Sequence, residues 1–200
     1  MNFENNKGVM SIDTQDSYLS FSRPFRLRNC RFEKVSFEQY LNACRKLEFD
    51  GIFEFGDESN VREDYDNIQL PRRSTPDSAG YDFYMPFPAV FTPDSPVTLP
   101  TGIRVILNQG TFLMCVPRSG LGFKYGTGLI NTTGVIDASY SESDNEGHIM
   151  AKITTRKPFK LDTGDRFMQG IILPFFITED DEPIADKRNG GFGSTGGTGK

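Results

Sequence analysis

The spacing of apolar residues along the chain changes from a helical pattern to a strand-like one. Between Ser36 and Leu47 these residues recur three or four positions apart, which places them on one face of a helix. The residues on that face are Phe37, Tyr40, Leu41, Cys44 and Leu47. Ser36 can cap the free N–H groups of the first turn, with Gln39 at the third helical position. The sequence therefore predicts a short amphipathic helix over this segment.

Short alternating segments separated by turns make up much of the remaining chain. One lies before the helix, at residues 31–35, and is predicted as a first strand. Beyond Ile68 the helical spacing disappears. Further strands are predicted at residues 79–84, 97–99, 103–107, 111–116, 149–154 and 166–176. Many short strands punctuated by prolines indicate an all-β sandwich or barrel.

Three segments carry too few apolar residues to add much to a core. Residues 1–22 are polar and predict a loosely held leader. Residues 50–66 are acidic and predict a solvated loop, with a partner-binding insertion as the alternative. From Pro183 onward the chain is polar and dense in glycine, although Phe192 suits a flexible arm that orders over a ligand. The predicted organisation is a leader (1–30), a first strand with a helical and acidic insertion (31–67), a β domain (68–182) and a glycine-rich arm (183–200).

Composition and charge limit the classes of function. The 200 residues include 27 acidic and 22 basic ones, and the net charge of -5 argues against a nucleic-acid binder, which needs a basic face. Cys30, Cys44 and Cys115 fit neither a zinc motif nor an even disulfide framework, so we expect a reducing cytoplasm. His148 is the only histidine, which leaves carboxylates as the available bases. No apolar run approaches the length of a membrane span, and no contact with a membrane is expected.

The strongest candidate for chemistry is the stretch from Gly134 to Tyr140. If residues 134–136 end a strand, Asp137 stands at its open end and Tyr140 follows across a tight bend. An acid and an aromatic face can then line one pocket. A polar turn closing a hairpin, with Asp137 capping backbone N–H groups, is the alternative for such a motif in isolation.

Two further stretches combine glycine, hydroxyl and charged groups in a way that suits phosphate. At residues 117–122 the chain leaves an apolar segment, where Arg118 can fork onto phosphate oxygens and Ser119 can donate to a bridging oxygen. A glycine turn with a surface arginine is the alternative. At residues 78–82 small residues allow close backbone approach, and Asp82 can hold a water of a hydrated metal or pin an arginine.

Arg166 and Gln169 form a third candidate pair. Residues three apart in a strand point to opposite faces of a sheet unless a bulge intervenes. We therefore expect either a bulge between the two or a structural role for one of them.

Five stretches, taken in order, resemble the signature motifs of the trimeric dUTP diphosphatases (dUTPases). They are residues 78–82, 117–121, 134–140, 164–169 and 188–196. The resemblance covers the chain from Ile68 to Gly196 and indicates a phage-type or bacterial member. It implies a distorted jelly roll, a β-clip barrel, assembled as a homotrimer. It also implies hydrolysis of dUTP to dUMP and pyrophosphate with Mg²⁺, which phosphates and waters hold without a direct protein ligand.

The resemblance also assigns roles to individual residues. Asp137 becomes the general base toward the water that attacks the α-phosphorus. Tyr140 packs beneath the deoxyribose, where a 2′-hydroxyl would collide, and main-chain groups around Asn131 read uracil. The implied substrate-binding residues are Arg118, Ser119, Gly120, Asn131, Gly134, Ile136, Tyr140, Gln169, Arg188, Phe192, Gly193, Ser194 and Thr195, with Asp82, Arg166 and Lys187 in support.

The chain departs from the family pattern in three places. A Leu-Pro-Arg-Arg element at residues 70–73 comes more than 30 residues after the predicted first strand, so the segment between them is expected to be an insertion. Residues 141–146 form an acidic extension beside the site, either a longer surface turn or an influence on the access of nucleotide or metal. In the arm, Lys187 stands where the family places arginine. Arg188 is expected to contact the γ-phosphate, with Lys187 as its rival.

Two alternatives use the same fold. A dCTP deaminase, or a bifunctional deaminase and diphosphatase, carries a catalytic glutamate in the strand after the aspartate-bearing hairpin, and residues 148–153 contain none. A dUTP-responsive regulatory binding protein would contact a protein partner through residues 36–66.

Overall fold

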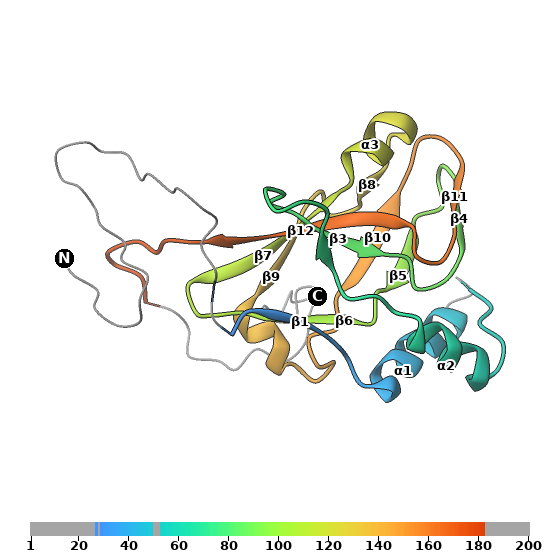
Figure 1. Cartoon of the computed structure of the whole chain (residues 1–200), viewed down its shortest axis with the longest axis horizontal. Helices are drawn as coiled ribbons and strands as arrows, with labels where there is room; N and C mark the ends of the chain where they lie inside the picture. Colours follow the sequence, from blue (N-terminus) through green and yellow to red (C-terminus); the bar gives the residue numbers. More distant parts are fainter. Residues whose placement is uncertain (1–26, 28, 50–52, 183–200) are drawn as a thin grey trace, which may run out of the picture.

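The computed structural model describes residues 27, 29–49 and 53–182, which fold into antiparallel sheets with three short α-helices (Figure 1). The largest sheet has five strands in the order β2-β3-β12-β7-β9. These strands are β2 (Arg72–Arg73), β3 (Tyr81–Tyr84), β12 (Arg166–Pro174), β7 (Thr111–Pro117) and β9 (Gly134–Asp137). β12 pairs with β3 on one side and β7 on the other, so it lies at the centre of the sheet.

Three smaller sheets complete the β structure. Their strands are β1 (Arg31–Lys34) with β6 (Ile103–Ile106), then β5 (Val97–Pro100) with β10 (Met150–Thr154) and β8 (Gly128–Leu129), and finally β11 (Phe159–Leu161) with β4 (Ala89–Phe91). Every pairing among the described strands is antiparallel. The predicted all-β class is therefore confirmed.

Each predicted strand is present, with differences of a few residues at its ends. The sequence did not predict β2, β4, β8 and β11, because two or three residues are too few to show an alternating pattern. The predicted helix is also present as α1 (Phe37–Phe49).

Helix α1 belongs to the same core as the strands. Its apolar face buries Tyr40 and Cys44 completely, and these side chains pack in one cluster with Leu99 of β5 and Ile103 of β6. Ser36 caps the helix as expected, since its hydroxyl accepts the Gln39 N–H at 3.2 Å. The burial of this face fixes the helix onto the strands.

The acidic segment predicted as a solvated loop contains a helix instead, α2 (Glu58–Asp66). Asp57 caps it by accepting the N–H groups of Ser59 at 2.9 Å and Asn60 at 3.2 Å. Asn60 Oδ1 accepts the Asp57 N–H at 3.3 Å, which completes a reciprocal cap. The prediction was wrong because one buried residue, Val61, and this cap carry a helix whose other side chains are mostly charged. α1 and α2 lie side by side at one end of the strands (Figure 1).

A further helix, α3 (Ser119–Tyr125), begins within the stretch that the sequence predicted to bind phosphate, where a glycine turn was the alternative. Gly126 ends it in the left-handed conformation, with φ +67°, and donates its N–H to the Gly122 oxygen at 2.9 Å. The Tyr125 ring stacks on Phe159 with ring centres 4.6 Å apart, and so anchors the helix to β11. This tertiary contact offsets the low helix propensity of its glycines, which sequence spacing alone does not show.

Two further observations concern the length and apolarity of the helices and the chemical state of the cysteines. No helix in the described part of the chain is both long and apolar enough to cross a membrane. Cys30, Cys44 and Cys115 are free thiols. Burial raises the pKa of Cys44 and of Cys115 to about 12, so both act as small apolar side chains of the core.

Candidate active site

A cavity of about 350 Å³ lies beside Tyr140, between the loop that joins β8 to β9 and strand β10. Four residues predicted to bind substrate line it, namely Asn131, Gly134, Ile136 and Tyr140. Met168 of β12 and residues of β7 and β10 complete its walls. The structure thus brings the predicted residues of this loop to one hollow, of a volume that suits part of a small molecule.

Asp137 is the last residue of β9, and the chain continues into a 3₁₀ helix, η1 (Ala138–Glu142), that carries Tyr140. As the sequence predicted, the carboxylate stands at the end of a strand and the phenol follows after a bend. Asp137 is half-buried, pairs in register with Phe112 of β7, and is not among the residues that line the cavity. Within one chain Asp137 therefore lies beside the cavity and does not line it.

Tyr140 is held by the polar segment that follows it. Its side chain is 5% exposed, and its phenol oxygen donates to the His148 main-chain oxygen at 3.1 Å. The same oxygen accepts from Asn145 Nδ2 at 2.8 Å. Asn145 Oδ1 in turn accepts from Ser143 Oγ at 2.7 Å and from the Gly147 N–H at 3.1 Å. The extension after Tyr140 thus holds the phenol in place through hydrogen bonds, a role that the sequence did not predict.

The same segment joins the site to helix α1. Glu146 accepts the N–H of Ser36 at 2.7 Å and its hydroxyl at 2.5 Å. Burial raises the pKa of Glu146, but these hydrogen bonds outweigh it and hold the pKa below its usual value. His148 is fully buried, and its Nε2 accepts the Gly102 N–H at 2.8 Å. Burial lowers the pKa of His148 to about 4, so the ring is neutral at pH 7.

A polar cluster forms around Asp82 of β3, whose carboxylate is 1% exposed. Its Oδ2 accepts from Ser74 Oγ at 2.6 Å and pairs with Arg166 Nη1 at 3.3 Å. Its Oδ1 accepts from Gln169 Nε2 at 3.0 Å and pairs with Arg118 Nε at 3.2 Å. Burial raises the pKa of Asp82, but the hydrogen bonds and the two guanidinium charges outweigh it, so the pKa is lowered. The ionised carboxylate therefore pins both arginines.

A bulge explains how Arg166 and Gln169 reach the same carboxylate. The pairing of β12 with β3 shifts between Arg166 and Met168, so one extra residue stands opposite a single step of β3. The shift turns both side chains to one face of the sheet. The bulge that the spacing of Arg166 and Gln169 required is therefore present. Ser74, which donates to Asp82 and accepts from Arg166 at 3.1 Å, was not predicted.

The stretch after β7 leaves its main chain open. Arg118 is the residue before α3, and Ser119 and Gly120 are exposed in the first turn. A Cβ placed on Gly120 would meet nothing within 4 Å, so a ligand can approach the backbone there. The other predicted residues, Lys187, Arg188, Phe192, Gly193, Ser194 and Thr195, lie outside the described residues.

The two groups of candidate residues lie toward opposite ends of β7. Asp137 stands opposite Phe112, near the start of this strand, whereas Arg118 follows its last residue. The six steps along the chain from Phe112 to Arg118 span roughly 20 Å at about 3.3 Å per step. The carboxylate of Asp137 and the guanidinium of Arg118 therefore cannot act on one phosphate group within a single chain.

Known proteins are similar to this chain in both sequence and fold. The family model described as dUTPase matches residues 66–196. A deoxyuridine 5'-triphosphate nucleotidohydrolase of Lactococcus lactis is 38% identical over 133 residues, which are 64% of this chain and 89% of that protein. A solved dUTPase from Streptococcus mutans has 30% identity and a TM-score of 0.54, over 74% of this chain and 98% of that one.

The solved structure of a mutant dUTPase from phage phi11 of S. aureus, which concerns the coordination of a structural Mg(II) ion, resembles this chain in fold alone. It has 20% identity and a TM-score of 0.50, over 60% of this chain and 92% of that one. The fold shared by these structures is jelly-roll-like, as the sequence motifs implied. Because the family model spans more than half of the residues, this chain belongs to the dUTPase family.

Proposed function

We propose that the chain hydrolyses dUTP to dUMP and pyrophosphate in a homotrimer whose sites are shared between subunits. The observation that carries this proposal is the position of Asp137 and Arg118 at opposite ends of β7. A base and a phosphate-binding group that far apart can meet only when a second copy of the chain supplies one of them. The names of the relatives, deoxyuridine 5'-triphosphate nucleotidohydrolases, support dUTP as the substrate.

Asp137 acts as the general base in this proposal. Its carboxylate takes a proton from a water, the water oxygen attacks the α-phosphorus, and the bond from that phosphorus to the bridging oxygen breaks. Pyrophosphate leaves with the bridging oxygen, and no covalent enzyme intermediate forms. Ser119 donates to the bridging oxygen as charge develops on it, and Arg118 and Gln169 hold the phosphates of the leaving group.

The cavity beside Tyr140 receives the nucleoside. The buried ring of Tyr140 lies under the deoxyribose, where it leaves no space for a 2′-hydroxyl. Main-chain groups around Asn131 read the uracil edge. Two hydrogen bonds of the phenol oxygen hold the Tyr140 ring in a fixed position. The ring therefore cannot move aside to admit the 2′-hydroxyl of a ribonucleotide.

Mg²⁺ fits this site as an ion held by the substrate. Among the described residues there is no group of three or more histidine, cysteine or acidic side chains placed to hold a metal. The four contacts of Asp82 already occupy the lone pairs of its carboxylate. Phosphate oxygens and waters would therefore hold the ion, which when bound neutralises charge on the phosphates.

The arm completes the proposed site. Residues 68–182 supply the β domain, and residues 183–200 supply the arm, with Arg188 or Lys187 at the γ-phosphate and Phe192 over the bound ligand. In the proposed trimer the loop at Asn131, the phosphate-binding residues and the arm each come from a different subunit.

Mixing two inactive variants tests the shared site. Asp137→Asn chains retain Arg118, and Arg118→Ala chains retain Asp137, so each homotrimer should be nearly inactive. With random equal mixing, about one quarter of pockets should take Asp137 from one kind of chain and Arg118 from the other. Recovery of about a quarter of the wild-type rate is expected in the whole mixture, which corresponds to about one pocket in three within the mixed trimers. A mixture no more active than its parents would refute the shared site.

A turnover screen tests the substrate independently. The wild-type protein is expected to release pyrophosphate from dUTP, and to leave UTP, dCTP and dTTP largely intact. Release of ammonia from dCTP would instead identify a deaminase of the same fold.

A further inference from the structure

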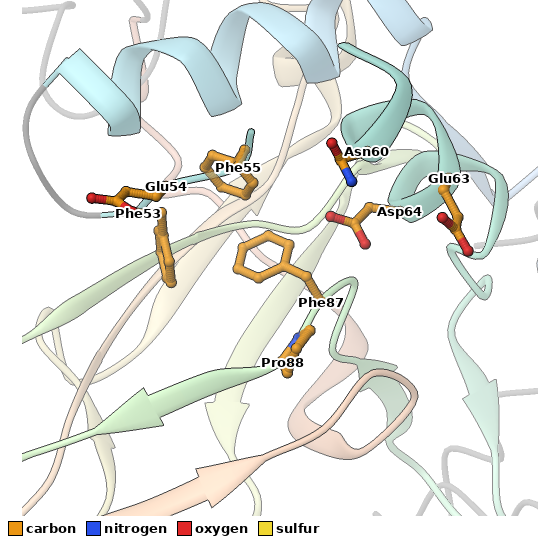
Figure 2. A pocket seen from close by; sticks show the side chains of 8 residues that line it. All are labelled: Phe53, Glu54, Phe55, Asn60, Glu63, Asp64, Phe87 and Pro88. Atoms are coloured by element: carbon orange, nitrogen blue, oxygen red, sulfur yellow. The ribbon is translucent and has the colours of Figure 1, made fainter. Parts of the chain in front are cut away.

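A second cavity, of about 260 Å³, lies between helix α2 and the connection from β3 to β4 (Figure 2). Its principal lining residues are three phenylalanines and three acids, Phe53, Phe55, Phe87, Glu54, Glu63 and Asp64. None of them lines the Tyr140 cavity or contacts Asp82. This α2 pocket is therefore separate from the proposed active site, and the dUTPase reaction gives it no role.

The aromatic wall of the α2 pocket is preformed. Phe87 meets Phe53 and Phe55 edge to face, with ring centres 5.0 Å and 4.9 Å apart. Phe55 and Phe87 are buried, and the Phe55 N–H donates to Glu48 Oε1 of α1 at 2.6 Å. The chain that carries two of the rings is thus tied to α1, so a ligand would meet a fixed surface.

The opposite wall, which α2 supplies, carries acidic side chains. Asn60 and Asp64 project from α2 toward the rings of Phe55 and Phe87, whereas Glu54 points away from them (Figure 2). Asp64 is half-buried, and this burial, with repulsion from Glu63, raises its pKa to about 6. Within residues 27, 29–49 and 53–182 none of the three acids forms an ion pair or a side-chain hydrogen bond. Burial disfavours the charged form of the Asp64 carboxylate, and a cation bound in the pocket would stabilise that form.

The volume of the α2 pocket and its negative charge limit which ligands could occupy it. The volume falls below the roughly 300 to 1,000 Å³ of sites for whole small molecules, so one side chain fits better than a nucleotide. The acids also repel phosphates, and no metal-holding cluster exists among the described residues. Aromatic faces beside a carboxylate suit a guanidinium, which stacks on a ring and forks onto the acid. The same helix already shows this contact, since the guanidinium carbon of Arg62 lies 3.2 Å from the centre of the Phe37 ring.

We infer that the α2 pocket receives an arginine side chain presented by a protein partner. One ring of the aromatic wall stacks on the flat face of the guanidinium, and Asp64 accepts its N–H groups. This inference does not depend on the proposed reaction, because no residue of the pocket takes part in it.

A peptide titration tests the inference on the full-length protein. The probe is the amidated, acetylated tripeptide Ala-Arg-Ala, and the matched probe carries citrulline, which has nearly the same shape without the charge. Ring signals of ¹³C-labelled phenylalanine report binding by NMR. We expect saturable shifts of the Phe53, Phe55 and Phe87 signals with the arginine peptide, and binding at least about ten-fold weaker with citrulline.

Two variants provide the controls. Asp64→Asn preserves shape and should weaken binding of the arginine peptide by about ten-fold while dUTP hydrolysis stays unchanged. Asp94→Asn removes an exposed charge outside the pocket, at a positive φ that asparagine tolerates, and should change nothing. Equal binding of the arginine and citrulline peptides would overturn the inference, as would equal binding of a lysine peptide or an Asp64→Asn protein that binds like wild type.

Discussion

Replacing Asn145 with alanine tests whether the loop after Tyr140 sets nucleotide affinity. The change removes three hydrogen bonds, to the Tyr140 hydroxyl, the Ser143 hydroxyl and the Gly147 N–H. At about 0.5 to 1.5 kcal/mol each, their loss should lower the free energy of unfolding by about 1.5 to 4.5 kcal/mol. Tyr140 keeps its bond to the His148 oxygen, so the ring loosens but stays in place.

The effect on catalysis should be confined to binding. Only the bond to Tyr140 bears on the nucleoside, so about 1 kcal/mol, or roughly a five-fold rise in KM for dUTP, is expected. kcat should change little, because Asn145 touches neither Asp137 nor the groups proposed to hold phosphate. Discrimination against UTP should weaken in parallel, as a mobile ring leaves space for a 2′-hydroxyl.

Steady-state kinetics and urea denaturation of four proteins check this reasoning. Asn145→Ala and Tyr140→Phe are compared singly and together, and Glu142→Ala serves as a control in the same extension, where its side chain is exposed. In the Tyr140→Phe background the KM effect of Asn145→Ala should disappear, because the shared hydroxyl is gone. An Asn145→Ala protein with lowered stability but unchanged KM and UTP discrimination would show that packing alone holds the ring.

Three further outcomes are expected. Asp137→Asn should retain binding of a non-hydrolysable dUTP analogue while kcat falls by about 10²- to 10⁴-fold, and near-normal turnover would remove Asp137 from the mechanism. Asp82→Asn should lower the free energy of unfolding by about 2 to 3 kcal/mol and reduce turnover, since Arg118 and Arg166 lose their counter-charge. In the wild-type protein the pKa of Asp82 is lowered in the folded state. The stabilisation by its carboxylate is therefore present above about pH 4 and is lost on further acidification. The neutral, buried His148 should make the free energy of unfolding fall by roughly 3 kcal/mol between pH 6.5 and 4, as the unfolded chain alone takes up a proton; urea denaturation of His148→Gln should lack this slope.

Local patterns in the sequence predicted local structure well. Helix α1 was readable because the spacing of its apolar residues and its Ser36 cap lie within one short segment. The strand that presents Asp137 was readable for the same reason. Helix α2 was not, because its acidic composition hides the single buried Val61 and the reciprocal cap between Asp57 and Asn60.

The contacts that shape the site depend on residues far apart in the chain. Arg166 and Gln169 reach Asp82 across 84 and 87 positions, and only a bulge in β12 lets them do so together. Family motifs supplied these residues, and Asp82 was expected to pin an arginine, but the sequence did not show that Gln169 and a second arginine meet on the same carboxylate. The contact of Glu146 with Ser36 spans 110 positions and leaves no periodic trace in the sequence.

The contact between Glu146 and Ser36 also couples two segments that depart from the family pattern. Deleting residues 36–66 would strip Glu146 of its two donors and uncover the core that α1 closes. Shortening residues 141–146 would take the acceptor from the first turn of α1 and release the ring of Tyr140. The segment at residues 36–66 and the extension at residues 141–146 are therefore structurally coupled. A shortened version of the protein that lacks only one of them should unfold more readily than the full-length chain.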